Sequence, residues 1–207
     1  MISESQKPLN SGFGAKSEPH EVLDGIDLTG KTAIVTGGYS GIGLETSRAL
    51  SESGAHVIVP ARRVEVAKNE LKGIVNEEDI LPLDLEDQNS IVAFVDDFIK
   101  TGLTLDILIN NAAMMACPEN PTKEGWDLQF AVNHIGHFIL TKGLLPALSE
   151  SGNARVVALS STAHKMSGIR WDDIHFKDSY DKWQSYGQSK TAASLLAIEL
   201  DSRMKDK

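Results

Sequence analysis

From residue 31 onward, short apolar runs alternate with stretches of helical spacing, and this alternation constrains the fold more than any other feature. The apolar runs cover residues 31–36, 55–60, 79–83, 105–110 and 155–160. Helical spacing follows in residues 42–53, 63–72, 87–100 and 124–148, and again from Ser185 to the end. Continuous apolar runs are typical of strands buried on both faces, and their alternation with helices predicts a mostly parallel sheet. With right-handed crossovers, the predicted fold is α/β and doubly wound.

The remaining composition predicts one domain with an extension. Residues 1–28 lack sustained periodicity and are predicted to form an N-terminal arm, followed by a single domain over residues 29–207. A formal net charge of -9 argues against a nucleic-acid surface. No apolar run approaches the roughly 18–20 residues of a membrane span. The first residues, MISESQKPLN, lack the features of a secretory signal, and the single cysteine, Cys117, excludes an internal disulfide, so we expect a cytoplasmic protein.

A glycine-rich stretch, TGGYSGIG at residues 36–43, directly follows the first predicted strand. Such a turn lets the backbone approach a pyrophosphate, which the free amides and the positive end of the next helix then bind. Gly37 suits the tight turn, Gly41 the close approach, and Gly43 the packing of helix on strand. The spacing is not GxGxxG, and no Lys-Ser/Thr follows a GxxxxG frame, which excludes a P-loop. A purely geometric turn is the alternative, but the position after the first strand favours a nucleotide site.

The second predicted strand ends in VPARR, residues 59–63, without an acidic residue. In dinucleotide-binding folds an acid at about this place binds the ribose hydroxyls. The planar guanidinium of an arginine instead suits a 2′-phosphate. We therefore predict NADP rather than NAD, with Arg62 as the main contact and Arg63 as a helper; the alternative is that both arginines only decorate the surface.

Near the end of the sequence, YGQSK at residues 186–190 places Tyr186 and Lys190 four residues apart. On a helix, such residues lie on the same face. A nearby cation favours the phenolate, typically lowering the pKa by about 1–3 units, so this pair could serve as an acid/base device. By itself, a tyrosine one turn from a lysine usually has no function.

Together, these motifs resemble those of the short-chain dehydrogenase/reductase family, with a match from Gly30 to about Leu200. The motifs that carry the resemblance are TGGYSGIG (36–43), Asp84-Leu85, NNAA (110–113, where the family has NNAG), Asn133 in VNHIGHF, Ser160-Ser161, and YGQSK (186–190). Within this family, the sequence most resembles the branch of retinol dehydrogenases and the oxidoreductase domain of WW-domain proteins. The stretches that carry this finer resemblance are NHIGHF, RVVALSSTAH and PARR.

The resemblance implies a Rossmann-like sheet of strand order 3-2-1-4-5 and an NADP-dependent oxidoreductase that interconverts an alcohol and a ketone or aldehyde by hydride transfer. It implies that Tyr186 passes the proton, that Lys190 binds the nicotinamide ribose and lowers the pKa of the phenol, that Ser161 bonds the substrate oxygen, and that Asn133 holds a water linking Lys190 to solvent. The implied cofactor contacts are Gly37, Tyr39, Ser40, Gly41, Ile42, Gly43, Arg62, Arg63, Asp84, Leu85, Asn110, Ala112, Tyr186 and Lys190.

Several of these residues also have simpler interpretations. Asp84, expected near the adenine amino group, could instead cap a helix. Asn133 could satisfy a backbone group, and Thr36 could only steady the glycine turn. His134 and His137 form an HxxH pair without a third ligand at suitable spacing, so we predict helix packing and no metal site. Met114 and Met115 either line the nicotinamide pocket or fill the core.

The 25 positions from Ser161 to Tyr186 exceed a minimal connection and contain Trp171, Phe176, Tyr180 and Trp183. They form either a flap over an apolar substrate or a surface excursion packed on its own side chains.

The sequence ends at Lys207, whereas members of the family continue for several dozen residues with two further strands. We therefore expect the sheet to stop before those strands and the fifth strand to be an exposed edge. The alternative to an enzyme acting on a small apolar alcohol or carbonyl compound is a nucleotide-binding pseudoenzyme or interaction module without turnover. A homodimer could form through the two longest helices, as in many relatives, unless the long segment before Tyr186 obstructs them.

Overall fold

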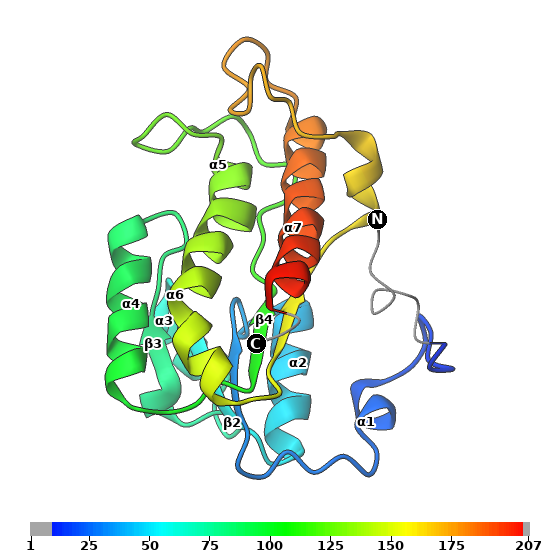
Figure 1. Ribbon diagram of the computed structural model, residues 1–207, viewed down its shortest axis with the longest axis vertical. Coiled ribbons are helices and arrows are strands. Elements are labelled where there is room, and N and C mark those ends of the chain that lie inside the picture. Colours follow the sequence, from blue (N-terminus) through cyan, green and yellow to red (C-terminus); the bar gives the residue numbers. More distant parts are fainter. Residues whose placement is uncertain (1–9, 205–207) are drawn as a thin grey trace.

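A five-stranded parallel sheet forms the centre of the computed structural model, which describes residues 10–204 (Figure 1). Its strands are β1 (Thr32–Val35), β2 (His56–Ala61), β3 (Ile80–Pro82), β4 (Ile107–Asn110) and β5 (Arg155–Ala158). The strand order is β3-β2-β1-β4-β5, and all four pairings are parallel. Both the order and the direction of the strands confirm the predicted Rossmann-like α/β fold.

Helices cover both faces of this sheet. The longer helices are α2 (Gly41–Glu52), α3 (Val64–Glu70), α4 (Gln88–Lys100), α6 (His137–Glu150) and α7 (Lys182–Met204). Shorter elements are α1 (Pro19–Val22), α5 (Leu128–Phe130), the 3-10 helices η2 (Glu77–Asp79) and η4 (Thr162–Met166), and the π-helix η3 (Ala131–Gly136). Figure 1 shows α4 and α6 packed side by side, with α7 next to the α5 end of this layer.

Two apolar clusters attach the helices to the sheet. Because successive strand side chains point to opposite faces, Ile34 and Ile58 belong to the cluster with Phe98 of α4 and Leu140 of α6. Their strand neighbours, including Val35, belong to the cluster on the α2 and α3 side. All four residues of β1 are buried. The core therefore fixes the carboxyl ends of the central strands, where the glycine-rich stretch begins.

Two helices start at different places from those predicted. The helix expected over residues 124–148 begins at Leu128, where Asp127 accepts a hydrogen bond from the backbone of Phe130. The π-helix η3 then interrupts it before α6 continues. The last helix begins at Lys182 rather than Ser185, because the Asp181 carboxylate accepts hydrogen bonds from the Trp183 and Gln184 amides. In both helices, a side-chain cap determines the first turn.

β5 is an edge strand, as expected from the sequence. It pairs only with β4 in the described part of the sheet, and Val157 is 44% exposed. At the other end of the sequence, residues 1–9 of the predicted arm lie outside the described residues. The remainder of the arm places α1 against α2, and Leu28 packs on the cluster beneath α2. Within residues 10–204, no helix is both long and apolar enough to cross a membrane.

Candidate active site

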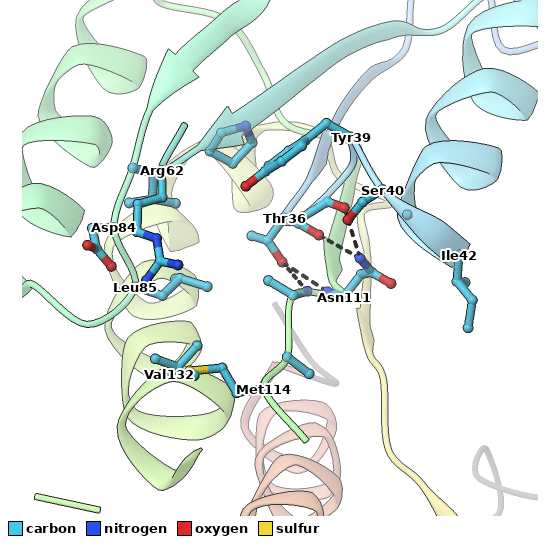
Figure 2. Close-up of a pocket in the computed structure, with 16 residues that line it drawn as sticks. Thr36, Tyr39, Ser40, Ile42, Arg62, Asp84, Leu85, Asn111, Met114 and Val132 are labelled. Carbon is cyan, nitrogen blue, oxygen red and sulfur yellow. Dashed lines mark hydrogen bonds between the residues drawn. The ribbon is translucent and has the colours of Figure 1, made fainter. Parts of the chain in front are cut away.

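A cavity of about 360 Å³ lies at the carboxyl ends of β1 to β4, the usual ligand position in open α/β sheets (Figure 2). The predicted residues that line it are Gly37, Tyr39, Ser40, Ile42, Gly43, Arg62, Asp84, Leu85 and Ala112. The predicted contacts that do not line it are Gly41, Arg63, Asn110, Tyr186 and Lys190. Further residues that line the cavity are Asn111, Ala113, Met114 and Val132.

The glycine-rich stretch has the geometry of an anion cradle. Gly37 has a φ of 63° and Gly41 a φ of 52°, both in the left-handed region that favours glycine. A methyl group at Gly43 would collide with the Gly37 carbonyl, so close packing requires glycine there. The first amides of a helix have no acceptor within it, and the Ser40 side chain does not cap α2. Gly41 itself lines a different groove, between α2 and the arm.

Arg62 and Asp84 lie at the side of the cavity opposite Ser40 and Ile42 (Figure 2). Arg62 is exposed and has no ion-pair partner within residues 10–204. Arg63 instead occupies the N-cap position of α3. The Asp84 carboxylate accepts a hydrogen bond of 3.0 Å from the Glu86 amide, so it also stabilises the turn after β3. The structure thus brings one of the two predicted arginines to the cavity.

The turn after β4 differs from the prediction by one residue. Asn110 is buried, and its amide donates to Thr141 Oγ1 at 2.9 Å, away from the cavity. Asn111 lines the cavity instead, and its amide donates to the Thr36 carbonyl at 2.8 Å. Of the two asparagines of this turn, Asn111 therefore lines the cavity, whereas the predicted Asn110 does not. The alternation of side chains along β4, with its last residue turned to the core, explains the shift.

On α7, Tyr186 and Lys190 are both buried, with 8% and 4% exposure. Lys190 Nζ lies 5.7 Å from the centroid of the Tyr186 ring and donates to the Leu159 carbonyl at 2.9 Å. Burial lowers the pKa of Lys190 from its usual value. The predicted juxtaposition of a phenol and an ammonium one turn apart is therefore present in the structure.

The two serines after β5 have different environments. The Ser160 hydroxyl bonds the Lys190 carbonyl at 3.1 Å and Ser194 Oγ at 2.7 Å, which commits it to packing against α7. Ser161 Oγ accepts a hydrogen bond of 3.2 Å from the Ala163 amide. Ser161 is half-buried and keeps its own proton for another acceptor. This difference favours Ser161 over Ser160 as the hydroxyl that contacts a substrate.

Asn133 lies in the π-helix η3 and joins the cavity to α7. Its Oδ1 accepts from the Met114 amide at 2.8 Å, and its Nδ2 donates to the Met114 carbonyl at 2.8 Å and to Ser189 Oγ at 2.9 Å. Met114 lines the cavity, and Ser189 lies between Tyr186 and Lys190. Both N–H groups of the Asn133 side chain therefore have protein acceptors.

The segment between Ser161 and Tyr186 is anchored to the body of the protein. Phe176 is 1% exposed, and the Tyr180 hydroxyl donates to the Cys117 carbonyl at 2.8 Å. Burial raises the pKa of Tyr180 to about 12. Gln129 donates to the Tyr180 oxygen at 3.0 Å and to Ser185 Oγ at 2.9 Å. Trp171, in contrast, is 77% exposed.

The histidine pair of the sequence packs into the protein. His137 contacts Thr36, and burial lowers the pKa of His134. No group of three potential ligands among His, Cys, Asp and Glu residues is placed to hold a metal ion in the described part of the chain. Met114 lines the cavity, whereas Met115 is 63% exposed.

Comparison with known proteins gives the same assignment as the motifs. The family model described as short chain dehydrogenase matches residues 31–207. Short-chain dehydrogenase TIC 32 B, chloroplastic, of Brassica napus is 40% identical over 97% of this chain and 67% of its own length. Retinol dehydrogenase 12 of Mus musculus is 42% identical over 86% of this chain and 58% of its own length. The chain thus spans about three fifths to two thirds of the length of these curated relatives.

Among solved structures, the Pseudomonas aeruginosa RhlG/NADP active-site complex has a TM-score of 0.68 and 28% identity, covering 86% of this chain and 69% of that one. A chloroplast protein stands among the relatives, so the cytoplasmic location stays a prediction. Because a family model covers nearly the whole described chain and the sheet has the matching strand order, this chain belongs to the short-chain dehydrogenase family.

Proposed function

We propose that this chain binds NADP(H) and interconverts an apolar alcohol and the corresponding ketone or aldehyde, with Tyr186 as the acid/base. The observation that carries the proposal is the buried pair of Tyr186 and Lys190, connected through Ser189 and Asn133 to a cavity lined by Arg62. The family membership supplies the reaction class.

The cavity residues suit a phosphorylated dinucleotide. The uncapped start of α2 offers amides and a positive dipole end to a pyrophosphate. Arg62, which makes no ion pair among residues 10–204, would offer its guanidinium to a 2′-phosphate. Asp84 and Leu85 lie beside it at the adenosine end of the cavity (Figure 2). At the opposite end, Met114 lies where the floor of the cavity approaches α7 through Asn133.

When bound, NADP(H) supplies or accepts the hydride, and the chain's own residues handle the substrate oxygen and the proton. The Ser161 hydroxyl would donate to that oxygen and orient it. The Tyr186 phenol would donate the proton during reduction and accept it during oxidation. The Lys190 ammonium would favour negative charge on the phenolic oxygen and would donate a hydrogen bond to the nicotinamide ribose. Asn133 keeps α7 in register with the cavity floor through Ser189 and Met114.

Titration with NADPH and NADH, followed by turnover assays with a panel of apolar ketones and aldehydes, tests the proposal. We expect tighter binding of NADPH than of NADH, and turnover that depends on Tyr186. Preferential binding of NADH would refute the role of Arg62, and unchanged turnover in Tyr186→Phe would refute the acid/base assignment.

A binding module without turnover is the second candidate, favoured by the open edge beside the catalytic helix. Val157 of β5 is 44% exposed, and Leu195 of α7 is 48% exposed. In the described part of the chain, no further strand pairs with β5 to cover this edge. Tight NADPH binding with no turnover of any compound in the panel would support this second function, and a homodimer through α6 and α7 remains a prediction for either.

A further inference from the structure

His137 is a buried side chain to which neither the proposed chemistry nor the proposed cofactor contacts assign a role. It lies in the first turn of α6 and is 2% exposed. Its Nε2 lies 2.9 Å from Thr36 Oγ1, and its Nδ1 lies 3.1 Å from the carbonyl oxygen of Asn133. Thr36 follows β1 as the first residue of the glycine-rich stretch, whereas Asn133 holds α7 through Ser189. The imidazole therefore bridges the cofactor side and the catalytic side of the site.

The acceptors around His137 determine where its proton lies. A carbonyl oxygen only accepts hydrogen bonds, so Nδ1 carries the proton and donates to Asn133. The ring is neutral because burial lowers the pKa of His137 to about 4, and its Nε2 then accepts from the Thr36 hydroxyl. The Ile109 carbonyl, 3.3 Å from Thr36 Oγ1, is the competing acceptor. It already accepts from the Thr36 and Asn111 amides, which leaves His137 as the better acceptor.

This direction orients the lone pairs of Thr36 toward the cavity floor. Thr36 Oγ1 accepts hydrogen bonds from the Asn111 amide at 2.9 Å and the Ala112 amide at 3.0 Å. Both residues line the cavity. A methyl group on Gly37 would lie 3.1 Å from the Ala112 Cα, so the floor and the glycine-rich stretch are in close contact. A rotation of the Thr36 side chain would release the Ala112 amide, whereas the Asn111 amide would keep its bond to the Ile109 carbonyl.

The other nitrogen of the ring acts on the catalytic side. The Asn133 carbonyl belongs to the π-helix, whose hydrogen-bond pattern is interrupted relative to an α-helix. The Nδ1 proton of His137 gives this carbonyl a fixed donor. The Asn133 amide in turn holds Ser189, between Tyr186 and Lys190.

We propose that His137 is a positioning residue that fixes the cavity floor through Thr36 and the catalytic helix through Asn133, so that the two halves of the site keep one relative placement. Its kinetic consequence rests on the proposed function, but the bridge itself can be measured in the ligand-free chain.

Two substitutions separate the two halves of the bridge. In His137→Gln, the amide oxygen reaches the place of Nε2 and still accepts from Thr36, but the bond to Asn133 is lost. In His137→Asn, the shorter amide reaches the place of Nδ1 and still donates to Asn133, but the bond to Thr36 is lost. The matched control is His134→Gln, three residues earlier, where the buried Nδ1 has no partner among the described residues.

Amide hydrogen exchange of Ala112, followed by NMR in the ligand-free chain, is the primary measurement. We expect exchange to be about tenfold faster in His137→Asn and in Thr36→Val, because one net hydrogen bond corresponds to roughly this factor. It should stay at the wild-type rate in His137→Gln and in His134→Gln. Equal exchange in the Asn and Gln variants would overturn the proposal.

Binding and turnover provide the second measurement. His137→Asn should weaken NADPH binding about tenfold with kcat retained, whereas His137→Gln should lower kcat about tenfold with NADPH binding retained. Equal losses of binding and kcat in both variants, with a parallel fall in melting temperature, would identify a merely structural role and overturn the proposal. A wild-type chain that shows the expected exchange pattern but binds no NADPH would refute the proposed function and still support the bridge.

Discussion

The two halves of the sheet are stabilised by different kinds of contact. Every residue of β1 is buried, and apolar side chains from helices cover both faces around it. β5 alternates between exposed and half-buried residues. Beside β5, the buried positions of the α5 to α7 region include many polar side chains with 3% exposure or less, namely Gln129, Asn133, Ser185, Gln188 and Ser189.

The apolar half around β1 acts as a scaffold, whereas the polar half beside β5 holds the candidate catalytic residues. Apolar burial is non-directional, so the β1 half provides stability without demanding one orientation of each side chain. Buried polar groups must find partners in good geometry, and they specify a single arrangement when they do. The half of the molecule that holds Tyr186 and Lys190 is thus the half in which orientation is most strongly determined.

The largest expected effect lies in the polar half. Tyr186→Phe removes the phenolic oxygen and should lower kcat about 10²–10⁴-fold, the usual contribution of a general acid/base. NADPH affinity and melting temperature should change little, because the ring still packs on α7. Steady-state kinetics and thermal unfolding measure the two quantities. Turnover close to the wild-type rate would show that the polar half does not supply the acid/base group.

In the apolar half, Phe98→Ala should reduce the free energy of unfolding by about 3–5 kcal/mol through loss of burial and formation of a cavity. Phe98 is 1% exposed, whereas Phe13, 49% exposed, provides a control in Phe13→Ala with little change. Chemical denaturation measures both. A fall in stability that is equal in the two variants would contradict the role of the β1 cluster as the scaffold.

The pH dependence of stability sharpens the same comparison. The pKa of His137 falls from 6.5 to about 4 on folding, through burial first and then the neighbouring Lys190 and His134 charges. Below pH 6.5 the unfolded chain binds a proton that the folded chain does not bind until about pH 4. The contribution of neutral His137 to the free energy of unfolding is therefore fully present above pH 6.5, and it is lost as the pH falls to about 4.

Between these two pH values, the free energy of unfolding should decrease by roughly 3 kcal/mol, since one pKa unit corresponds to about 1.4 kcal/mol. Denaturation curves at successive pH values should show this slope in the wild type and a reduced slope in His137→Gln. The same slope in both proteins would assign the pH dependence to other groups.

Arg62 belongs to the apolar half but extends into the cavity. Arg62→Ala should weaken NADPH binding about 10–100-fold and leave NADH binding unchanged, as expected for hydrogen bonds to a charged group. Arg63→Ala is the matched control, because Arg63 does not line the cavity. Equal effects of the two substitutions on the NADPH dissociation constant would show that the cavity does not distinguish the two arginines.

The smallest effect concerns the contact between η4 and α7. A methyl group at Gly187 would lie 2.7 Å from the Ala163 carbonyl, which is too close without movement of η4 and the adjacent Ser161. Gly187→Ala should cost about 1–3 kcal/mol of stability, the usual cost of overpacking. Gly168→Ala meets no atom within 4 Å and should be neutral in the same denaturation experiment.

Periodicity was sufficient to predict the parallel strands and the helices between them, because these depend on local patterns and on the handedness of crossovers. The strand order was predicted from the resemblance to the family. Periodicity did not predict the π-helix at Ala131–Gly136 or the early start of α7, which depend on individual side-chain bonds.

The motifs located the glycine-rich stretch and the pair on α7, but they placed Asn110 rather than Asn111 in the cavity. For His137 they predicted only helix packing, and they did not reveal its partner Thr36, which is 101 residues away in the sequence. Contacts of this range are set by tertiary packing, and the spacing of residues in one sequence does not reveal them. Gln129, which binds the start of α7 from 56 residues away, was missed for the same reason.

The hydrogen bond between Lys190 Nζ and the Leu159 carbonyl has a consequence for covalent labelling. An acylating reagent needs a neutral and reachable amine; the lowered pKa of Lys190 favours the first condition, while its burial opposes the second. The surface amine of Lys100 presents the reverse combination, because it is exposed and the neighbouring Asp97 raises its pKa. The rate at which Lys190 is acylated should therefore report how often α7 and the end of β5 separate. Acylation of this amine would thus measure the local opening of the site.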